Sequence, residues 1–242
     1  MNKPNPTKKQ KKEIVSPVFK ILSFLATNLP DFLEFFPYDK TNINSMGEDE
    51  LTGALVFFLI NRSRAEDFSF MPQATQKGRR TVDIGVFLFG NRLSHIFCIE
   101  AKFLPHSPFD YVTGEYAAIK RFKAMQHGVN NSVDNIPLPQ NGIIAYVKSG
   151  TFEKHFIKIN KEIQKFANRF SQKPDDFGLN WDKSEQLEKI YFKSIAKLFS
   201  KHPRQKAPEV KLYHFWVNIP QISSTAKTHK NAQKNQSRVG PN

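Results

Sequence analysis

Two apolar stretches joined by Gly90-Asn91 constrain the fold of this chain more than any other feature of its sequence. The first stretch covers residues 81–89 and the second covers residues 93–102. Gly-Asn is a strong signal for a two-residue β-turn, because both residue types tolerate positive φ. We therefore predict a β-hairpin. Its strands carry three charged residues where the pattern would place apolar ones, namely Asp83, Glu100 and Lys102.

The loop length sets which residues face one another across this hairpin. With a two-residue loop, Asp83 pairs with Cys98, and Glu100 is its diagonal neighbour at about 7–8 Å between Cα atoms. With a four-residue loop, Asp83 lies directly opposite Glu100. Either even length places both carboxylates on one face, because side chains alternate with period 2. Lys102 shares the face of Glu100 for the same reason, so we expect all three charged side chains in one patch.

Two carboxylates in a buried patch are costly unless a cation compensates their charge. Mg²⁺ takes oxygen ligands, commonly one or two carboxylates with waters and substrate phosphate. Asp83 and Glu100 are therefore candidate metal ligands, with the Ala101 carbonyl as a third oxygen and Mn²⁺ as an alternative ion. Lys102 is a candidate for orienting or deprotonating the attacking water, or for holding the phosphate. A structural salt bridge among the charged side chains is the alternative.

A Glu-x-Lys motif alone is a weak signal, since about one chance copy is expected in a chain of this length. A second copy, Glu209-Val210-Lys211, has no Asp-bearing strand before it, and we interpret it as a chance match. The copy at Glu100 is favoured because an Asp, a turn and apolar flanks accompany it.

The chain is strongly basic, with 36 Lys and Arg against 22 Asp and Glu among its 242 residues. Residues 1–13 and residues 221–242 each carry a net charge of +4. A basic chain favours a polyanionic partner, because counterions are released when phosphates are neutralised. Both ends are polar, so we expect disordered tails. A merely solubilising role for these tails is the alternative.

Cysteine use and hydropathy indicate the compartment. The single cysteine, Cys98, lies in an apolar strand, excludes an intramolecular disulfide and favours a reducing, cytoplasmic location. We interpret it as a small buried hydrophobe. No Cys/His cluster has zinc-ligand spacing, and the N-terminus lacks the apolar core of a signal peptide. The apolar run over residues 51–60 is too short to cross a bilayer, so we expect no membrane association.

Hydrophobic periodicity and capping signals predict one α/β domain over residues 14–220. A capping box, Ser45-Met46-Gly47-Glu48, predicts the start of its second helix. The predicted fold is a mixed central β-sheet flanked by helices. Its expected helices cover residues 14–36, 45–62, 111–127, 152–170 and 184–200, and its expected strands cover residues 81–89, 93–102, 143–147 and 212–219, with a short strand at 68–71.

The hairpin residues resemble the PD-(D/E)xK nuclease superfamily, which has the restriction-endonuclease-like fold. The resemblance rests on Val82-Asp83-Ile84 and Ile99-Glu100-Ala101-Lys102. The helix that begins Glu48-Asp49-Glu50-Leu51-Thr52 is similar to the acidic first helix of many members. The resemblance covers residues 45–150, whose element order fits the family's αβββαβ core. Val82 stands where the motif's name has proline, a departure that is common in the family.

This resemblance implies Mg²⁺-dependent hydrolysis of nucleic-acid phosphodiester bonds. By it, Asp83 and Glu100 bind the metal, and Lys102 serves the nucleophilic water. An acid from the first helix often completes such a site. We favour Glu48 over Glu50, because Glu48 shares a helical face with apolar residues and is expected to point inward. Its alternative role is that of the reciprocal capping-box residue.

We therefore expect an endonuclease, with DNA favoured over RNA and with host defence or restriction as a setting drawn from family analogy. A homodimer or a partner protein would supply target recognition. One alternative is a catalytically inactive nucleic-acid-binding protein of the same fold. Another is an interaction module whose basic tails contact an acidic protein.

Several further residues give weaker signals. Three basic residues before the first hairpin strand are candidates for phosphate contacts, namely Lys77, Arg79 and Arg80. The predicted helix over 111–127 offers three candidates for the substrate side, namely Tyr116, Lys120 and Lys123. We interpret His95 as a core histidine. His127 ends the same predicted helix, where the helix dipole alone favours a histidine.

Overall fold

The computed structural model describes residues 16–32, 34, 43, 45–76, 81–90, 94–104, 107–130 and 136–219. Both predicted tails lie outside these residues, as do Asn91 of the predicted turn and the three candidate phosphate-binding residues Lys77, Arg79 and Arg80. The helices are α1 (Pro17–Asn28), α3 (Glu48–Arg62), α4 (Pro108–Val112), α5 (Ala118–Lys123) and α6 (Phe152–Phe170), with 3₁₀ turns η1 (Leu29–Asp31) and η2 (Ser63–Ala65).

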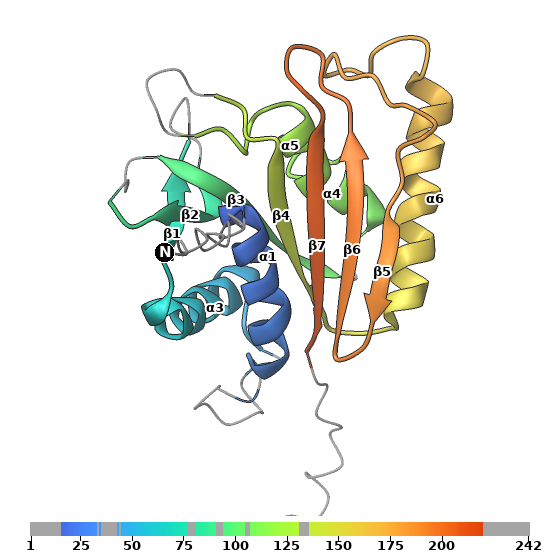
Figure 1. The fold of residues 1–242 in the computed structure, drawn as a ribbon. Coiled ribbons are helices and arrows are strands. Elements are labelled where there is room, and N and C mark those ends of the chain that lie inside the picture. The colour runs from blue at the N-terminus through green and yellow to red at the C-terminus, as the bar shows by residue number, and fades with distance from the viewer. Residues whose placement is uncertain are drawn as a thin grey trace, which may run out of the picture.

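A seven-stranded mixed sheet forms the centre of the described chain (Figure 1). Its strands are β1 (Phe68–Thr75), β2 (Thr81–Leu88), β3 (His95–Leu104), β4 (Gln140–Val147), β5 (Glu188–Phe192), β6 (Ile195–His202) and β7 (Val210–Asn218). Their order across the sheet is β1-β2-β3-β4-β7-β6-β5. The β3–β4 and β4–β7 pairs are parallel and the others antiparallel. This confirms the predicted α/β class with a mixed sheet flanked by helices.

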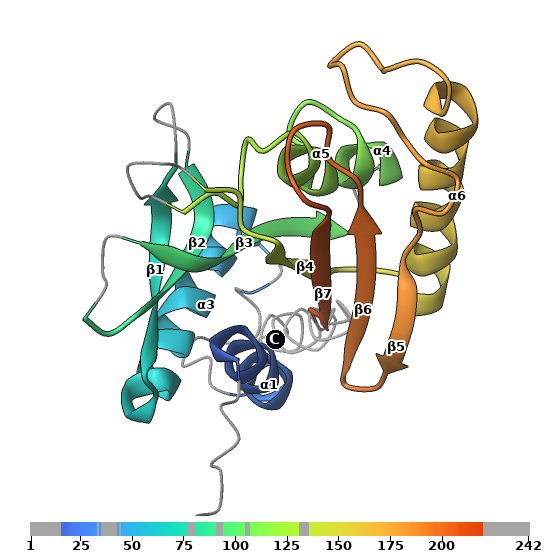
Figure 2. The same cartoon turned by 45° about the horizontal axis from the view of Figure 1, so that its top comes forward.

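Helices cover both faces of the sheet and close two apolar cores (Figures 1 and 2). On one face, α1 and α3 pack through residues such as Ile21, Leu25, Leu51 and Leu55. On the other, α4, α5 and α6 pack through Val112, Ile119, Phe122 and Ile163. Cys98 belongs to this second core, as expected of a small buried hydrophobe, and burial raises the pKa of its thiol to about 12.

The predicted helix over 184–200 is wrong. This segment forms β5 and β6, an antiparallel pair joined at Lys193 and Ser194. Its Lys, Glu, Leu and Ala content favours a helix locally. In the fold, β6 instead pairs with β7 at eight positions from Ile195 to His202, and its side chains alternate between the two faces of the sheet. Tertiary pairing has overridden a modest helix preference.

Two other predictions need adjustment. The single helix predicted over 111–127 is two short ones, α4 and α5, which are separated by a turn at Gly114. The short strand predicted at 68–71 continues to Thr75 as β1, the edge strand of the sheet.

The register of the β2–β3 hairpin differs from the one that a two-residue turn predicts. Ile84 pairs with Ile99, and Gly85 with Cys98. One step further along this register, Asp83 lies opposite Glu100, as the four-residue alternative predicts. The pairing register shifts between Val86 and Phe87, so Phe87, which is nearer the turn, pairs with His95. The two carboxylates are close enough for the charge of Glu100 to raise the pKa of Asp83.

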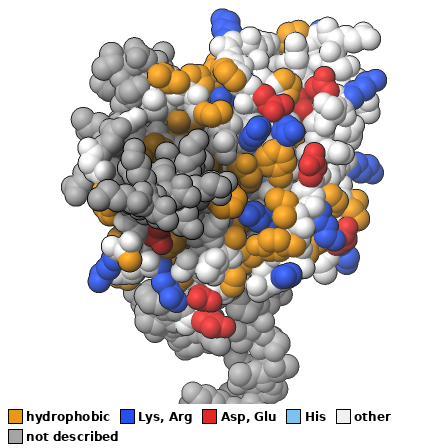
Figure 3. All heavy atoms as spheres, viewed as in Figure 1, with side chains coloured by type: hydrophobic (Ala, Val, Ile, Leu, Met, Phe, Trp, Pro, Cys, Tyr) orange, Lys and Arg blue, Asp and Glu red, His pale blue; other side chains and the backbone are white. Residues whose placement is uncertain are grey.

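The sheet at β5, β6 and β7 faces the viewer in Figure 1 without a described helix in front of it. Figure 3 shows apolar side chains there with basic and acidic ones interspersed. On the paired strands β6 and β7, the rings of Phe199 and Tyr213 lie 5.2 Å apart between centroids. None of the described helices is both long and apolar enough to span a bilayer.

Candidate functional site

Three elements bring four charged side chains together, and we call this group the acidic cluster. It consists of Glu48 at the start of α3, Asp83 on β2, and Glu100 and Lys102 on β3. The Lys102 Nζ lies 3.2 Å from Glu48 Oε1 and 3.2 Å from Glu100 Oε1. The Glu100 side chain is fully buried, whereas that of Glu48 is 29% exposed. The cluster therefore reaches solvent on the side of α3.

The two candidate acids at the start of α3, Glu48 and Glu50, have different roles. Glu48 points inward, as predicted. The N-cap of α3 is Gly47, and its N–H donates to Glu50 Oε2 at 2.8 Å. Glu50 is thus the capping residue. The Glu48 carboxylate turns toward β3 and accepts a hydrogen bond from the Phe103 N–H at 2.7 Å. The capping-box pattern correctly predicted that a helix starts here. The helix begins two residues later than an N-cap at Ser45 implies.

Asp83 stands where the β2–β3 ladder stops. The last paired residues are Ile84 and Ile99, and beyond them the Ala101 N–H donates to Asp83 Oδ2 at 2.7 Å. The N–H and C=O of one residue in an antiparallel strand point toward the same neighbour. The Ala101 carbonyl therefore also points toward β2. Asp83 Oδ1 has no hydrogen-bond partner among the described residues.

Glu100 is held by three basic side chains. Besides Lys102, the Arg121 Nη1 lies 2.7 Å from Glu100 Oε1, and the His127 Nδ1 lies 2.7 Å from Glu100 Oε2. The His127 contact is close but poorly aligned, since neither atom has a partner in hydrogen-bond geometry. Sequence reasoning missed Arg121 and assigned His127 only to the helix end. No local pattern marks either residue, because both reach Glu100 through the folding of α5 onto β3.

The turn after α5 aims His127 at the cluster. Met125 has a φ of 55° and Gly128 a φ of 73°, both in the left-handed region. A Cβ at Gly128 would lie 2.7 Å from the Asn141 side chain, so glycine is required there by space as well as by backbone angle. A positive φ at a non-glycine residue such as Met125 costs free energy that the surrounding structure must offset.

The cluster holds more negative charge than it neutralises internally. Burial, and then the charge of Glu100, raise the pKa of Asp83 to about 7, despite the Ala101 hydrogen bond and the charge of Lys102. Burial acts to raise the pKa of Glu100, but His127, Lys102 and Arg121 lower it overall. Burial acts to lower the pKa of Lys102, but the surrounding carboxylates raise it overall. Lys102 is therefore an ammonium, and this arrangement does not give it the lowered pKa of a base.

The donor types of the cluster suit a hard cation such as Mg²⁺. Asp83 Oδ1, the Ala101 carbonyl and the partly exposed Glu48 carboxylate are the available oxygens. In the described ranges, no three Asp, Glu, His or Cys side chains stand close enough together to hold an ion as they are. The Lys102 ammonium lies between Glu48 and Glu100 instead. Metal binding there requires this flexible side chain to turn aside, so the residues fit the ion in chemistry and not in their present geometry.

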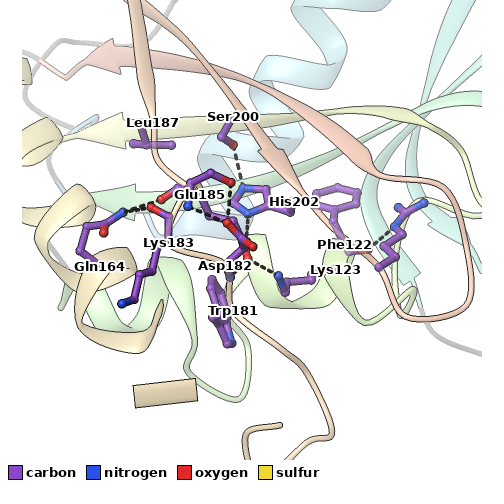
Figure 4. A network of polar contacts seen from close by, with 12 residues as sticks. Phe122, Lys123, Gln164, Trp181, Asp182, Lys183, Glu185, Leu187, Ser200 and His202 are labelled. Atoms are coloured by element: carbon purple, nitrogen blue, oxygen red, sulfur yellow. Dashed lines mark hydrogen bonds and ion pairs between the residues drawn. The ribbon is translucent and has the colours of Figure 1, made fainter. Parts of the chain in front are cut away.

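Buried side chains from the far end of the sheet hold α5 in place (Figure 4). The Lys123 Nζ lies 2.6 Å from Glu185 Oε1, and both side chains are buried. Arg204 Nε donates to the Phe122 carbonyl at 3.1 Å. These contacts fix a six-residue helix that would not be stable alone. They act as positioning contacts for Arg121, which directly precedes the two anchor points, Phe122 and Lys123, in the same helix.

Glu185 also belongs to a set of buried polar side chains that we call the buried network: Lys123, Glu185, His202, Ser200 and His214. His202 Nδ1 lies 2.6 Å from Glu185 Oε2, and its Nε2 lies 2.8 Å from Ser200 Oγ. This order of acid, imidazole and hydroxyl is that of a nucleophilic triad. However, Glu185, His202 and Ser200 are each at most 1% exposed. A substrate cannot reach them, so we interpret the network as structural.

The remaining candidate residues fall into exposed and buried groups. Tyr116 is exposed, as a residue on the substrate side should be. Lys120 and Lys123 are buried, and Lys123 belongs to the buried network, which excludes it from direct substrate contact. His95 is buried, and burial lowers the pKa of its imidazole, consistent with its interpretation as a core histidine.

No family model, curated protein or solved structure matches this chain. The function proposed below is therefore supported by the residues of this chain and their geometry.

Proposed function

We propose that this chain is a Mg²⁺-dependent endonuclease that hydrolyses phosphodiester bonds, with DNA as the favoured substrate. One observation carries the proposal: α3, β2 and β3 bring three carboxylates into one partly exposed cluster, with Lys102 Nζ 3.2 Å from two of them and Asp83 bonded to the N–H of the neighbouring Ala101. A purely structural ion pair needs no surplus of acid. Here burial, and then the charge of Glu100, raise the pKa of Asp83 to about 7, a condition that a bound cation relieves.

The residues have separate roles in this proposal. Asp83 and Glu48, with the Ala101 carbonyl, would hold the ion, which supplies Lewis-acid stabilisation of phosphate charge and lowers the pKa of bound water. Lys102, as an ammonium, binds a phosphate oxygen of the scissile group. Arg121 and His127 keep the buried Glu100 ionised and oriented. The order α3, β1, β2, β3, α4/α5, β4 also supports a restriction-endonuclease-like core and the PD-(D/E)xK resemblance.

A second candidate is a nucleic-acid-binding protein that has the same fold and no cleavage activity. A specific observation favours it: Lys102 and Arg121 already lie against Glu100 Oε1 and His127 lies against its Oε2, so both oxygens of this carboxylate are occupied and less available to a metal. The two candidates differ in what Mg²⁺ does, since only the nuclease needs the ion for turnover.

The test is cleavage of plasmid DNA, single-stranded DNA and RNA in Mg²⁺, Mn²⁺ or EDTA. Asp83→Asn and Lys102→Ala are each expected to lower the cleavage rate at least about 100-fold, because each removes a group that acts on the reacting phosphate. Lys165→Ala is the matched control, since Lys165 is exposed on α6, far along the chain from the cluster. Circular dichroism checks that the variants fold.

Metal-independent binding without cleavage would favour the second candidate. Cleavage that persists in both cluster variants would contradict the proposed site.

A further inference from the structure

Two cavities lie next to Lys102 and to the other basic side chains that contact Glu100. The first, of about 380 Å³, is lined by Lys102, Phe103, Phe109, Asp110, Tyr111, Glu115 and Tyr116. The second, of about 450 Å³, is lined by Thr81, Glu115, Tyr116, Lys120, Arg121, Gln126, His127 and Phe177. We call them the lysine cavity and the arginine cavity. They share Glu115 and Tyr116, and each is of a size that holds a small ligand, since such pockets measure roughly 300–1,000 Å³.

Each cavity ends at a side chain that contacts Glu100. The lysine cavity includes Lys102, whose Nζ is 3.2 Å from this carboxylate. The arginine cavity includes Arg121 and His127, which lie 2.7 Å from its two oxygens. A polymer that occupies both cavities therefore lies beside Lys102 and beside the two other basic partners of Glu100, with Tyr116 at the boundary between its two halves.

The rims of these cavities carry exposed aromatic rings. Tyr116 is 64% exposed, Phe177 60% and Phe109 46%. A cation already packs on one side of two of these rings. The Arg121 guanidinium is 5.1 Å from the Tyr116 ring centroid, and the Lys120 Nζ is 3.0 Å from that of Phe177. The exposure of both rings leaves the rest of their surface to solvent, as in aromatic platforms on which nucleic-acid bases stack.

The charge of the cavities argues against recognition through phosphates alone. Lys102 in the lysine cavity is outnumbered by Asp110 and Glu115. In the arginine cavity, Lys120 and Arg121 exceed Glu115 by one charge. A surface that grips the backbone of a duplex needs many basic contacts. Carboxylates can instead accept hydrogen bonds from the amino groups of bases, and bases are accessible to such groups and to aromatic rings only when they are unpaired.

We propose, on the premise that the acidic cluster is a nuclease site, that its substrate is a single-stranded segment of nucleic acid whose bases stack on Tyr116 and Phe177. The arginine cavity binds the part of the strand that presents more of its phosphates. The lysine cavity binds a base between the rings of Phe109 and Tyr116. Single-stranded DNA and RNA offer the same stacking surface, so both are included in the test.

The experiment measures binding without turnover. Fluorescence anisotropy in EDTA compares a labelled single strand of roughly 10 nucleotides, within the usual site size for such domains, with its own duplex at one salt concentration. The full chain is expected to bind the single strand more tightly. Tyr116→Ala and Phe177→Ala should each weaken single-strand binding about 5- to 100-fold, the range for loss of one base–aromatic stack.

Two further variants make the result specific. Tyr116→Phe keeps the ring and should bind as the unmodified chain does. Phe19→Ala is the matched control, because Phe19 is 62% exposed on α1 and lines neither cavity. Equal affinity for single strand and duplex, or unchanged binding in both alanine variants, would overturn the inference.

The same experiment separates this inference from the nuclease proposal. Ring-dependent single-strand binding without Mg²⁺-dependent cleavage would leave the inference standing and remove the nuclease. Mg²⁺-dependent cleavage with equal binding of single strand and duplex would do the reverse.

Discussion

The acidic cluster and the buried network use the same kinds of residue in opposite ways. Each contains a buried glutamate, Glu100 or Glu185, that a lysine and a histidine both contact within about hydrogen-bond distance. In the buried network, the partners match in number and direction. In the acidic cluster, no basic side chain of the described residues lies within ion-pair distance of Asp83, and the Glu48 side chain is 29% exposed. An unpaired carboxylate and access to solvent therefore distinguish a candidate site from a structural element, whereas residue type does not.

A single proton assignment satisfies the buried network. Burial lowers the pKa of both His202 and His214, so both rings are neutral. His202 Nδ1–H then donates to Glu185, and its Nε2 accepts from the Ser200 hydroxyl. His214 Nε2–H donates to Ser200 Oγ, and its Nδ1 accepts from the Tyr111 hydroxyl at 2.7 Å. This tautomer assignment follows from the partners. With this assignment, each ring nitrogen of His202 and His214 either donates or accepts a hydrogen bond.

The largest effect expected in this comparison comes from Lys123→Met. The change leaves the buried Glu185 without its cationic partner, so we expect the free energy of unfolding to fall by about 3–5 kcal/mol. Urea denaturation measures it. The double variant Lys123→Met/Glu185→Gln removes both charges and should recover much of the loss. If the single variant is as stable as the unmodified chain, the network is not the structural support that we describe.

Asp83→Asn should instead increase the free energy of unfolding. The folded chain holds the Asp83 proton more tightly than the unfolded chain, since its pKa rises to about 7. The free energy of unfolding of the unmodified chain therefore falls as the pH rises from about 4 to 7. Above that range, Asp83 causes no further change in it. The asparagine variant lacks this loss and should be more stable at pH 8 by roughly 2–4 kcal/mol. Denaturation at pH 5 and pH 8 measures both chains.

Mg²⁺ provides a control for the same variant. An ion that binds the folded state stabilises it by mass action. At pH 8, Mg²⁺ should therefore raise the urea midpoint of the unmodified chain and leave that of Asp83→Asn nearly unchanged. Equal shifts in the two chains would show that Asp83 is not a ligand.

The smallest effect is expected from Ser200→Ala. The hydroxyl joins His202 to His214, and its removal leaves a buried ring nitrogen on each side unpaired. We expect a loss of about 1–2 kcal/mol in unfolding free energy and unchanged cleavage per folded molecule. A large fall in cleavage with intact stability would instead show that Glu185, His202 and Ser200 take part in catalysis. The contrast between the buried network and the acidic cluster would then not hold.

Much of the acidic cluster could be predicted from local sequence because strand alternation is a short-range rule. Asp83, Glu100 and Lys102 interrupt an apolar pattern, and Glu48 stands at a recognisable helix start. The exact register needed the fold, because the sequence left two registers open and only the observed pairs of β2 with β3 choose between them. The predicted helix over 184–200 failed because its partner, β7, lies beyond the window in which periodicity is judged.

The sequence by itself determined that apolar strands carry two acids and a lysine on a single hairpin, because side-chain direction along a strand depends only on residue parity. It also determined the inward acid of α3, through helical spacing. Tertiary structure alone decided that Arg121 and His127 reach Glu100, and that Glu185, His202 and Ser200 are sealed from solvent. Contacts between residues far apart in the chain depend on how helices and strands pack. Burial then sets whether a charged group remains available for chemistry or is consumed in holding the fold together.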